Sequence, residues 1–167
     1  MTIDNGQWTI ISKSEAETQN IAGEFAGTLT SGDVVALFGD LGAGKTAFTR
    51  GVAIALGVDE TQISSPTFTL VNEYDGALKL YHFDVYRLEN AKFDELDWID
   101  EYLFGDGVCL IEWAEYILPI LPKNYVKVEL ERLSESERKI TITRQAMPAL
   151  SRIDNDCKQH SAKSEGG

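Results

Sequence analysis

One eight-residue segment constrains the fold of this 167-residue chain more than any other. Residues 39–46 read Gly-Asp-Leu-Gly-Ala-Gly-Lys-Thr, which matches the phosphate-binding pattern G-x-x-x-x-G-K-[S/T] at every fixed position. The short apolar run Val34–Phe38 precedes this segment, and a helix is expected from Thr46 to about Leu56, where Gly57 ends it. A P-loop requires this order of strand, loop and helix, so the pattern predicts a nucleotide-binding α/β fold.

The residue types in the loop explain how it would hold phosphates. Glycines allow the backbone to curl so that its N–H groups point at an anion, and the N-terminus of the following helix adds to the attraction. We expect Lys45 to contact the β- and γ-phosphates and Thr46 to offer its hydroxyl to Mg²⁺, which prefers oxygen ligands. The predicted nucleotide-binding residues of the loop are Asp40, Leu41, Gly42, Ala43, Gly44, Lys45 and Thr46.

Two carboxylates are candidates for the second half of the site. Glu112 follows the apolar run Val108–Ile111 and would emerge at the carboxyl end of a buried strand, where ligands of open α/β sheets bind. Asp84 shares one face of a predicted strand with His82 and Tyr86, because side chains alternate along a strand. We expect Glu112 and Asp84 to serve as metal ligands together with Thr46, and as catalytic residues together with Lys45.

Three further polar residues have a weaker signal. Ser65 and Thr67 follow the P-loop helix, where many P-loop proteins place a switch that senses the γ-phosphate and its metal, although ordinary turn chemistry also explains a Ser-Pro sequence. His82 is a possible base, but a single histidine among aromatic residues is more often structural. Arginines and lysines form no basic stripe, so no nucleic-acid groove is predicted.

The remaining pattern predicts a three-layer, P-loop NTPase-like fold with a central, mostly parallel sheet, helices on both faces and a β-hairpin. A capping box at Ser14 opens a helix that extends to Leu29, and Phe93–Phe104 has the pattern of an acidic amphipathic helix. Other predicted elements are strands at Trp8–Ser12 and Val108–Ile111, a hairpin of Thr67–Tyr74 with Leu78–Tyr86, a helical segment to Leu118, and a C-terminal pair of Tyr125–Leu133 with Lys139–Arg144.

Composition narrows the class of protein. The apolar content of 43% supports a buried core, and the apolar runs are too short for a membrane span, so we expect one domain over residues 1–145 with no membrane partner and a flexible tail over 146–167. The net charge of −12 disfavours direct binding of nucleic acid. Two cysteines without metal-ligand spacing and the lack of a secretory signal favour a cytoplasmic location.

The nucleotide is more consistent with ATP than with GTP. Guanine recognition usually requires an Asn-Lys-x-Asp element, and the nearest approach, Asn90-Ala91-Lys92-Phe93-Asp94, has the wrong spacing. The P-loop alone does not identify the phosphoryl acceptor. An ATPase, a small-molecule kinase and a nucleotide-dependent adaptor without significant turnover all remain open, although no arginine-rich lid segment favours the kinase.

Four ordered motifs reveal a more specific relationship. The chain resembles the TsaE or YjeE family, bacterial ATPases of the tRNA threonylcarbamoyladenosine pathway, from about Ser14 to Arg144. The motifs that carry the resemblance are Gly39–Thr46, Ser65–Val71, His82–Arg87 and Ile111–Trp113.

The resemblance implies a weak ATP-Mg²⁺ hydrolase that supports two partner proteins, which install threonylcarbamoyl on adenosine 37 of tRNAs reading ANN codons. It implies contact with tRNA only through these partners. Thr46 and Glu112 map onto the family's Mg²⁺ residues, and Asp84 maps onto the aspartate of its H-x-D-x-Y-R motif. Ser12 and, more weakly, Glu131 map onto the side of the site that holds adenine.

Overall fold

A mixed sheet of eight strands organises the computed structural model, which describes residues 2–4, 6–66 and 68–144. The strand order is β1-β2-β8-β7-β3-β6-β5-β4. The strands are β1 (Thr2–Asp4), β2 (Gln7–Ser12), β3 (Val34–Phe38), β4 (Val71–Tyr74), β5 (Leu80–Asp84), β6 (Val108–Glu112), β7 (Val126–Arg132) and β8 (Arg138–Arg144). The predicted tail, 146–167, lies outside the described residues.

The parallel part of the sheet is its centre. Strands β7, β3, β6 and β5 run parallel to their neighbours in this group, whereas β1, β2, β8 and β4 join by antiparallel pairs. The α/β fold class is therefore confirmed, but the sheet is mixed instead of mostly parallel. The reason is that the hairpin of β7 and β8 inserts between β2 and β3, so that only one of its strands can run parallel to β3.

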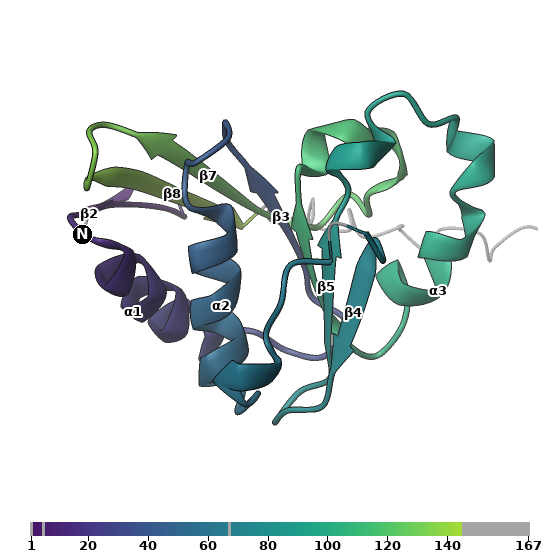
Figure 1. Cartoon of the computed structure of the whole chain (residues 1–167), viewed down its shortest axis with the longest axis horizontal. Helices are drawn as coiled ribbons and strands as arrows, with labels where there is room; N and C mark the ends of the chain where they lie inside the picture. The colour runs from purple at the N-terminus through teal and green to yellow at the C-terminus, as the bar shows by residue number, and fades with distance from the viewer. Residues whose placement is uncertain (1, 5, 67, 145–167) are drawn as a thin grey trace, which may run out of the picture.

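Helices cover both faces of the sheet, as predicted (Figure 1). On one face, α1 (Glu15–Ala26) packs beside α2 (Lys45–Ala55), and Phe25 and Phe48 meet with their ring centroids 5.7 Å apart. The other face is covered by the segment that includes α3 (Asp100–Leu103) and by the 3₁₀ turns η5 (Ala114–Ile120). Each face buries its own apolar cluster, which explains why β3 is apolar throughout and why β6 is apolar up to its last residue, Glu112.

The start of α1 follows the predicted capping box. The Ser14 side chain accepts a hydrogen bond from the N–H of Glu17 at 3.1 Å, and the Glu17 carboxylate accepts one from the N–H of Lys13 at 2.7 Å. These contacts satisfy donors that a helix N-terminus leaves unpaired. The helix ends at Ala26, three residues before the predicted end.

The prediction of one amphipathic helix over Phe93–Phe104 is wrong. The segment forms two 3₁₀ turns, η3 (Phe93–Glu95) and η4 (Asp97–Ile99), followed by the short α3. A continuous helix would place Asp97 one turn from Asp94, Asp100 and Glu101, and like charges at these spacings destabilise a helix. Leu96, Ile99 and Leu103 are nevertheless buried, so the apolar periodicity identified the inward face correctly.

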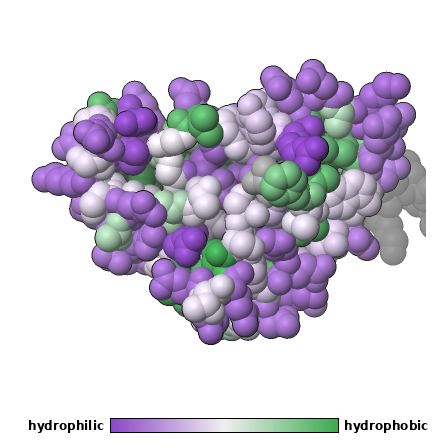
Figure 2. All heavy atoms as spheres, viewed as in Figure 1, coloured by the Kyte–Doolittle hydropathy of each residue, from purple (hydrophilic) through white to green (hydrophobic). Residues whose placement is uncertain are grey.

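The predicted hairpin is confirmed in β4 and β5, which pair antiparallel over shorter ranges than expected. Two 3₁₀ turns complete the described elements, η1 (Glu60–Gln62) and η2 (Tyr86–Leu88). None of the helices in the described ranges is long and apolar enough to cross a bilayer. The face of the molecule in Figure 2 is mostly hydrophilic, and its hydrophobic residues form small separate groups.

Candidate nucleotide-binding site

The predicted P-loop connects β3 to α2 and depends on glycine geometry. Gly39, Gly42 and Gly44 all have positive φ, at 141°, 77° and 105°. A Cβ on Gly39 would overlap the backbone carbonyl of Leu130 on β7. Side chains are therefore excluded where the loop leaves the sheet, and the backbone can curl in the way that exposes N–H groups to an anion.

Lys45, at the first turn of α2, turns back over the loop. Its ammonium donates hydrogen bonds to the carbonyl of Gly39 and, at 3.1 Å, to that of Asp40. It also lies 3.4 Å from the centroid of the Trp113 ring. Burial lowers the pKa of Lys45 below its usual value, while attraction to Glu112, and to a smaller extent to Glu115, Asp84 and Asp40, acts in the opposite direction.

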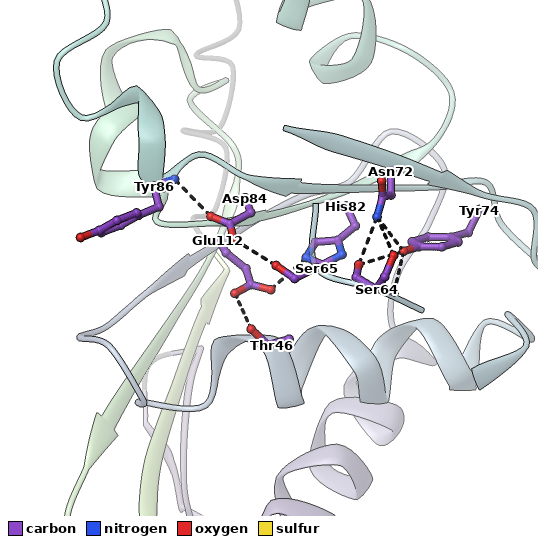
Figure 3. Close-up of polar contacts among 9 residues, drawn as sticks. All are labelled: Thr46, Ser64, Ser65, Asn72, Tyr74, His82, Asp84, Tyr86 and Glu112. Atoms are coloured by element: carbon purple, nitrogen blue, oxygen red, sulfur yellow. Dashed lines mark hydrogen bonds and ion pairs between the residues drawn. The ribbon is translucent and has the colours of Figure 1, made fainter. Parts of the chain in front are cut away.

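Thr46 and Glu112 meet at the centre of the site (Figure 3). The Thr46 hydroxyl donates a hydrogen bond of 2.9 Å to Oε2 of Glu112, and Nε2 of His82 lies 2.9 Å from Oε1 of the same carboxylate. His82 and Glu112 are almost fully buried. If Glu112 accepts from His82, the neutral ring carries its proton on Nε2, which leaves Nδ1 as an acceptor without a hydrogen bond among the described residues.

Asp84 lies beside Glu112, because β5 and β6 place these two residues in register. Its Oδ2 accepts a hydrogen bond from the Ser65 hydroxyl at 3.2 Å, and its Oδ1 accepts one from the N–H of Tyr86 at 3.2 Å. Two buried carboxylates therefore end adjacent parallel strands. The predicted switch residue Ser65 reaches this pair, whereas Thr67 lies outside the described residues.

A small polar network holds the backbone just before Ser65. The Tyr74 hydroxyl accepts a hydrogen bond from the Ser64 N–H at 3.2 Å and donates one to the Ser64 carbonyl at 3.1 Å. The Asn72 amide donates to the Ser64 carbonyl at 3.1 Å and to its hydroxyl at 3.2 Å (Figure 3). Strand β4 thus fixes the position of the segment that carries Ser65.

The P-loop and the carboxylates of Asp84 and Glu112 border a cavity of about 650 Å³. Its walls come from the P-loop, the start of α1, the ends of β5 and β6, and the β7–β8 turn. The lining residues are Ser14, Glu15, Thr18, Leu41, Gly42, Ala43, Gly44, Lys45, Thr46, Ala47, Ser65, Asp84, Glu112, Trp113, Glu135, Ser136 and Arg138. A cavity of this size falls in the usual range for small-molecule and cofactor sites.

The two residues expected on the adenine side do not line this cavity. Ser12 is fully buried, and its hydroxyl lies 2.7 Å from that of Thr18 and donates to the Ser14 carbonyl at 2.8 Å. Glu131 is exposed, forms an ion pair with Lys139 at 3.3 Å, and borders a separate cavity. Ser12 is the last residue of β2, and it lies buried against Ser14 and Thr18 at the start of α1. The wall of the main cavity therefore includes Thr18 but not Ser12.

The donor set fits Mg²⁺ bound together with a nucleotide. Thr46, Glu112 and Asp84 all present oxygen atoms near the P-loop, and oxygen is the ligand type that Mg²⁺ prefers. The described residues contain no group of three or more His, Cys, Asp or Glu side chains that could enclose a metal. Such an incomplete set is typical of Mg²⁺ sites in which substrate phosphates and water supply the remaining ligands.

Trp113 belongs to the Ile111–Trp113 motif, but its sequence position predicts no role for it. It follows Glu112 directly and has a left-handed backbone, with φ 63° and ψ 37°, which is unusual for a bulky residue. Sequence position places it at a strand end, but neither its conformation nor its contact with Lys45 has a signal in one sequence. Arg138 and Ser136 were also not expected in the cavity wall. They reach it from the end of the β7–β8 hairpin, which is far from the P-loop in the sequence.

Comparison with known proteins gives a consistent result. The family model described as "Threonylcarbamoyl adenosine biosynthesis protein TsaE" matches residues 12–140. The chain is 48% identical over 128 residues to the tRNA threonylcarbamoyladenosine biosynthesis protein TsaE of Bacillus subtilis, covering 76% of this chain and 79% of the relative. It is 42% identical over 136 residues to the Treponema pallidum protein of the same name, covering 79% and 97%.

A solved structure extends the similarity to three dimensions. The crystal structure of YdiB from Bacillus subtilis superposes with a TM-score of 0.69 at 41% sequence identity. The match covers 86% of this chain and 88% of the YdiB chain. The strand and helix that flank the P-loop, β3 and α2, lie within the region that the family model spans.

Proposed function

This chain belongs to the TsaE family, and we propose that it is an ATPase that binds and hydrolyses ATP-Mg²⁺ to support threonylcarbamoyladenosine formation on tRNA. The observation that carries the proposal is the hydrogen bond of 2.9 Å between the Thr46 hydroxyl and Glu112 beside the glycine-rich loop. This hydrogen bond joins the first turn of the P-loop helix to the buried carboxylate that ends β6. Phosphoryl transfer requires a phosphate-binding loop with metal ligands beside it, and this arrangement supports that assignment.

Each residue then has a defined task. The loop N–H groups and the Lys45 ammonium hold the β- and γ-phosphates, because charge-assisted hydrogen bonds to anions are the strong ones. Thr46 and Glu112 hold the metal, which when bound neutralises charge on the transferring phosphate. Asp84, adjacent to Glu112 and hydrogen-bonded to Ser65, orients water on the metal side of the site.

The phosphoryl acceptor in this proposal is water. The cavity wall offers Ser65, Asp84 and Glu112 near the phosphate end, which are groups that order water and metal. The proposed partners are the two other proteins of the bacterial threonylcarbamoyl-transfer complex, which hold the transfer chemistry. Contact with tRNA through those partners agrees with the net charge of −12, since a polyanion is repelled by such a surface.

The test combines binding with turnover. Titration calorimetry with ATP and Mg²⁺ should give saturable binding to the wild-type protein, and Lys45→Ala should weaken it at least about tenfold, as expected for the loss of a contact worth about 1.5 to 3 kcal/mol. Unchanged binding by Lys45→Ala would contradict the P-loop assignment.

Single-turnover phosphate release with the partner proteins separates the alternatives. Release of free phosphate supports the ATPase. Stoichiometric phosphorylation of a member of a metabolite panel would identify a kinase instead. ATP-dependent association with the partners in the absence of phosphate release would identify an adaptor.

A further inference from the structure

An aromatic cluster of Trp113, Tyr86 and Tyr116 borders the P-loop lysine. The Trp113 ring stacks on Tyr116, with centroids 6.0 Å apart and planes 5° from parallel, and also contacts Tyr86 at 4.8 Å. Its other neighbour is the Lys45 ammonium, 3.4 Å from the ring centroid. None of the tasks in the proposed ATPase cycle uses this tryptophan.

The contacts of Lys45 account for its three N–H donors. Two of the donors serve the carbonyls of Gly39 and Asp40, and the Trp113 ring is the third contact of the ammonium. The face of an indole ring carries negative partial charge, so it attracts a cation without itself being an ion. The ring therefore attracts the Lys45 ammonium without forming an ion pair with it.

The alternative partners for Lys45 are carboxylates. Attraction to Glu112 and Asp84 acts on the ammonium, yet in the described part of the chain no ion pair joins Lys45 to any carboxylate. Glu112 is engaged with Thr46 and His82 instead. A lysine drawn onto Glu112 would block both the phosphate position and the metal position.

The backbone of Trp113 indicates that the ring is held in place. A left-handed conformation is costly for an L-residue with a large side chain, and such strain persists where surrounding contacts over-determine it. The contacts of the ring with Tyr86 and Tyr116 supply this support together, so the loss of one of them leaves the other in place.

We propose that Trp113 is a positioning residue for Lys45, whose ring holds the ammonium on the loop carbonyls and away from Glu112 until nucleotide phosphates replace the ring as its third partner. The inference rests on the proposed function, since it assigns the ring to preparing the same phosphate site. It also predicts that the Trp113 ring increases ATP affinity by positioning Lys45.

The contact itself can be tested in the free protein. Incorporation of 5-fluorotryptophan gives three indole reporters, Trp8, Trp98 and Trp113, and the ¹⁹F signal of Trp113 is assigned by its loss in Trp113→Phe. Lys45→Met should shift the Trp113 signal and leave those of Trp8 and Trp98 in place. A Trp113 signal that does not respond to Lys45→Met would overturn the proposal.

The effect on the nucleotide is tested by comparing ring and non-ring variants. Trp113→Leu should weaken ATP-Mg²⁺ binding by about three- to tenfold, and Trp113→Phe should restore most of the affinity because it retains an aromatic face. Tyr116→Leu is the matched control, since it removes the stacking partner and leaves the ring beside Lys45. Equal losses in Trp113→Leu and Trp113→Phe, or a full loss in Tyr116→Leu, would assign Trp113 a packing role only.

Failure of this inference is distinguishable from failure of the proposed function. Absence of ATP binding by the wild-type protein would refute the ATPase and leave the ¹⁹F result for the free protein standing. Normal ATP binding by Trp113→Leu would refute the positioning role and leave the ATPase intact.

Discussion

The Thr46 hydroxyl and the Glu112 carboxylate lie 2.9 Å apart, although 66 positions separate them in the chain. Thr46 is in the first turn of α2 and Glu112 ends β6, which pairs directly with β3, the strand that leads into the P-loop. The parallel pairing of β3 with β6 therefore brings the start of α2 and the acidic strand end to one edge of the sheet. This geometry leads to the first prediction.

Glu112→Gln should lower ATP hydrolysis at least about tenfold, because the amide keeps the size of the side chain and removes the charge that holds the metal. Binding of ATP without Mg²⁺ should change little, since the loop and Lys45 are unaltered. Asp84→Asn should show the same pattern. Phosphate release in the assembled complex measures the effect, and wild-type turnover in either variant would contradict the role of that residue.

Gly39→Ala should destabilise the fold and weaken nucleotide binding, because the new Cβ would overlap the Leu130 carbonyl. Gly57→Ala is the matched control: it also has positive φ, at 87°, but no atom lies within 4 Å of a Cβ there. In urea unfolding, we expect Gly39→Ala to lower the free energy of unfolding by at least about 1 kcal/mol more than Gly57→Ala does. Equal losses of unfolding free energy in the two variants would show that the backbone of β7 shifts to accommodate the added Cβ.

Tyr74→Phe should reduce hydrolysis while leaving ATP affinity within about twofold of wild type, because it releases the backbone before Ser65 without touching the P-loop. The lost hydrogen bonds should also lower stability by about 1 kcal/mol. Tyr125→Phe is the control, since the Tyr125 hydroxyl makes no hydrogen bond within the described ranges. Parallel losses of turnover in both variants would argue against a role for the Ser64 network.

Much of the site could be predicted because it depends on local sequence. The glycines and Lys45 occur in one segment, and the apolar runs that end before Gly39 and at Glu112 mark strands buried on both faces. Pairing of β3 with β6 then follows from the preference of such strands for the centre of a sheet. His82 had the pattern of a structural histidine, and its contact with Glu112 became visible only from the register of β5 with β6.

Other features depend on contacts between distant segments. The insertion of β7 and β8 between β2 and β3 has no local signal, so the mixed character of the sheet and the arrival of Arg138 at the cavity were not foreseen. The segment 93–104 has the apolar spacing of a helix, but repulsion between its acidic residues outweighs that pattern. The left-handed backbone of Trp113 is accompanied by contacts with two aromatic neighbours, Tyr86 of η2 and Tyr116 of η5.

The Cys109 thiol should resist alkylation in the folded protein. Burial raises its pKa from 9.0 to about 12, and its side chain is inaccessible on β6. In a Cys157→Ser variant, iodoacetamide at pH 8.5 should therefore label the protein only after unfolding, as mass spectrometry would show. Rapid labelling of the folded variant would contradict the burial of β6.

The same thiol should make stability fall at high pH. Because the pKa is higher in the folded state, the unfolded chain loses the proton first, so the contribution is complete below pH 9 and is lost as pH rises toward 12. Over that range the slope should be about 1.4 kcal/mol per pH unit steeper than in Cys109→Ala, which cannot titrate. Identical slopes in urea unfolding would indicate that Cys109 is already ionised in the folded protein.

The position of β7 and β8 in the sheet determines how late in translation the site can fold. These are the last described strands to leave the ribosome, yet they separate β2 from β3 and supply the carbonyl of Leu130 against which Gly39 packs. The nascent chain can therefore complete the P-loop motif early, but the loop lacks the Leu130 carbonyl until β7 is made, and β7 can pair fully with β8 only after synthesis has passed residue 144. Formation of a nucleotide-competent pocket is thus a late event in translation, and a chain truncated before β8 should be a substrate for chaperones and proteases instead of an ATPase.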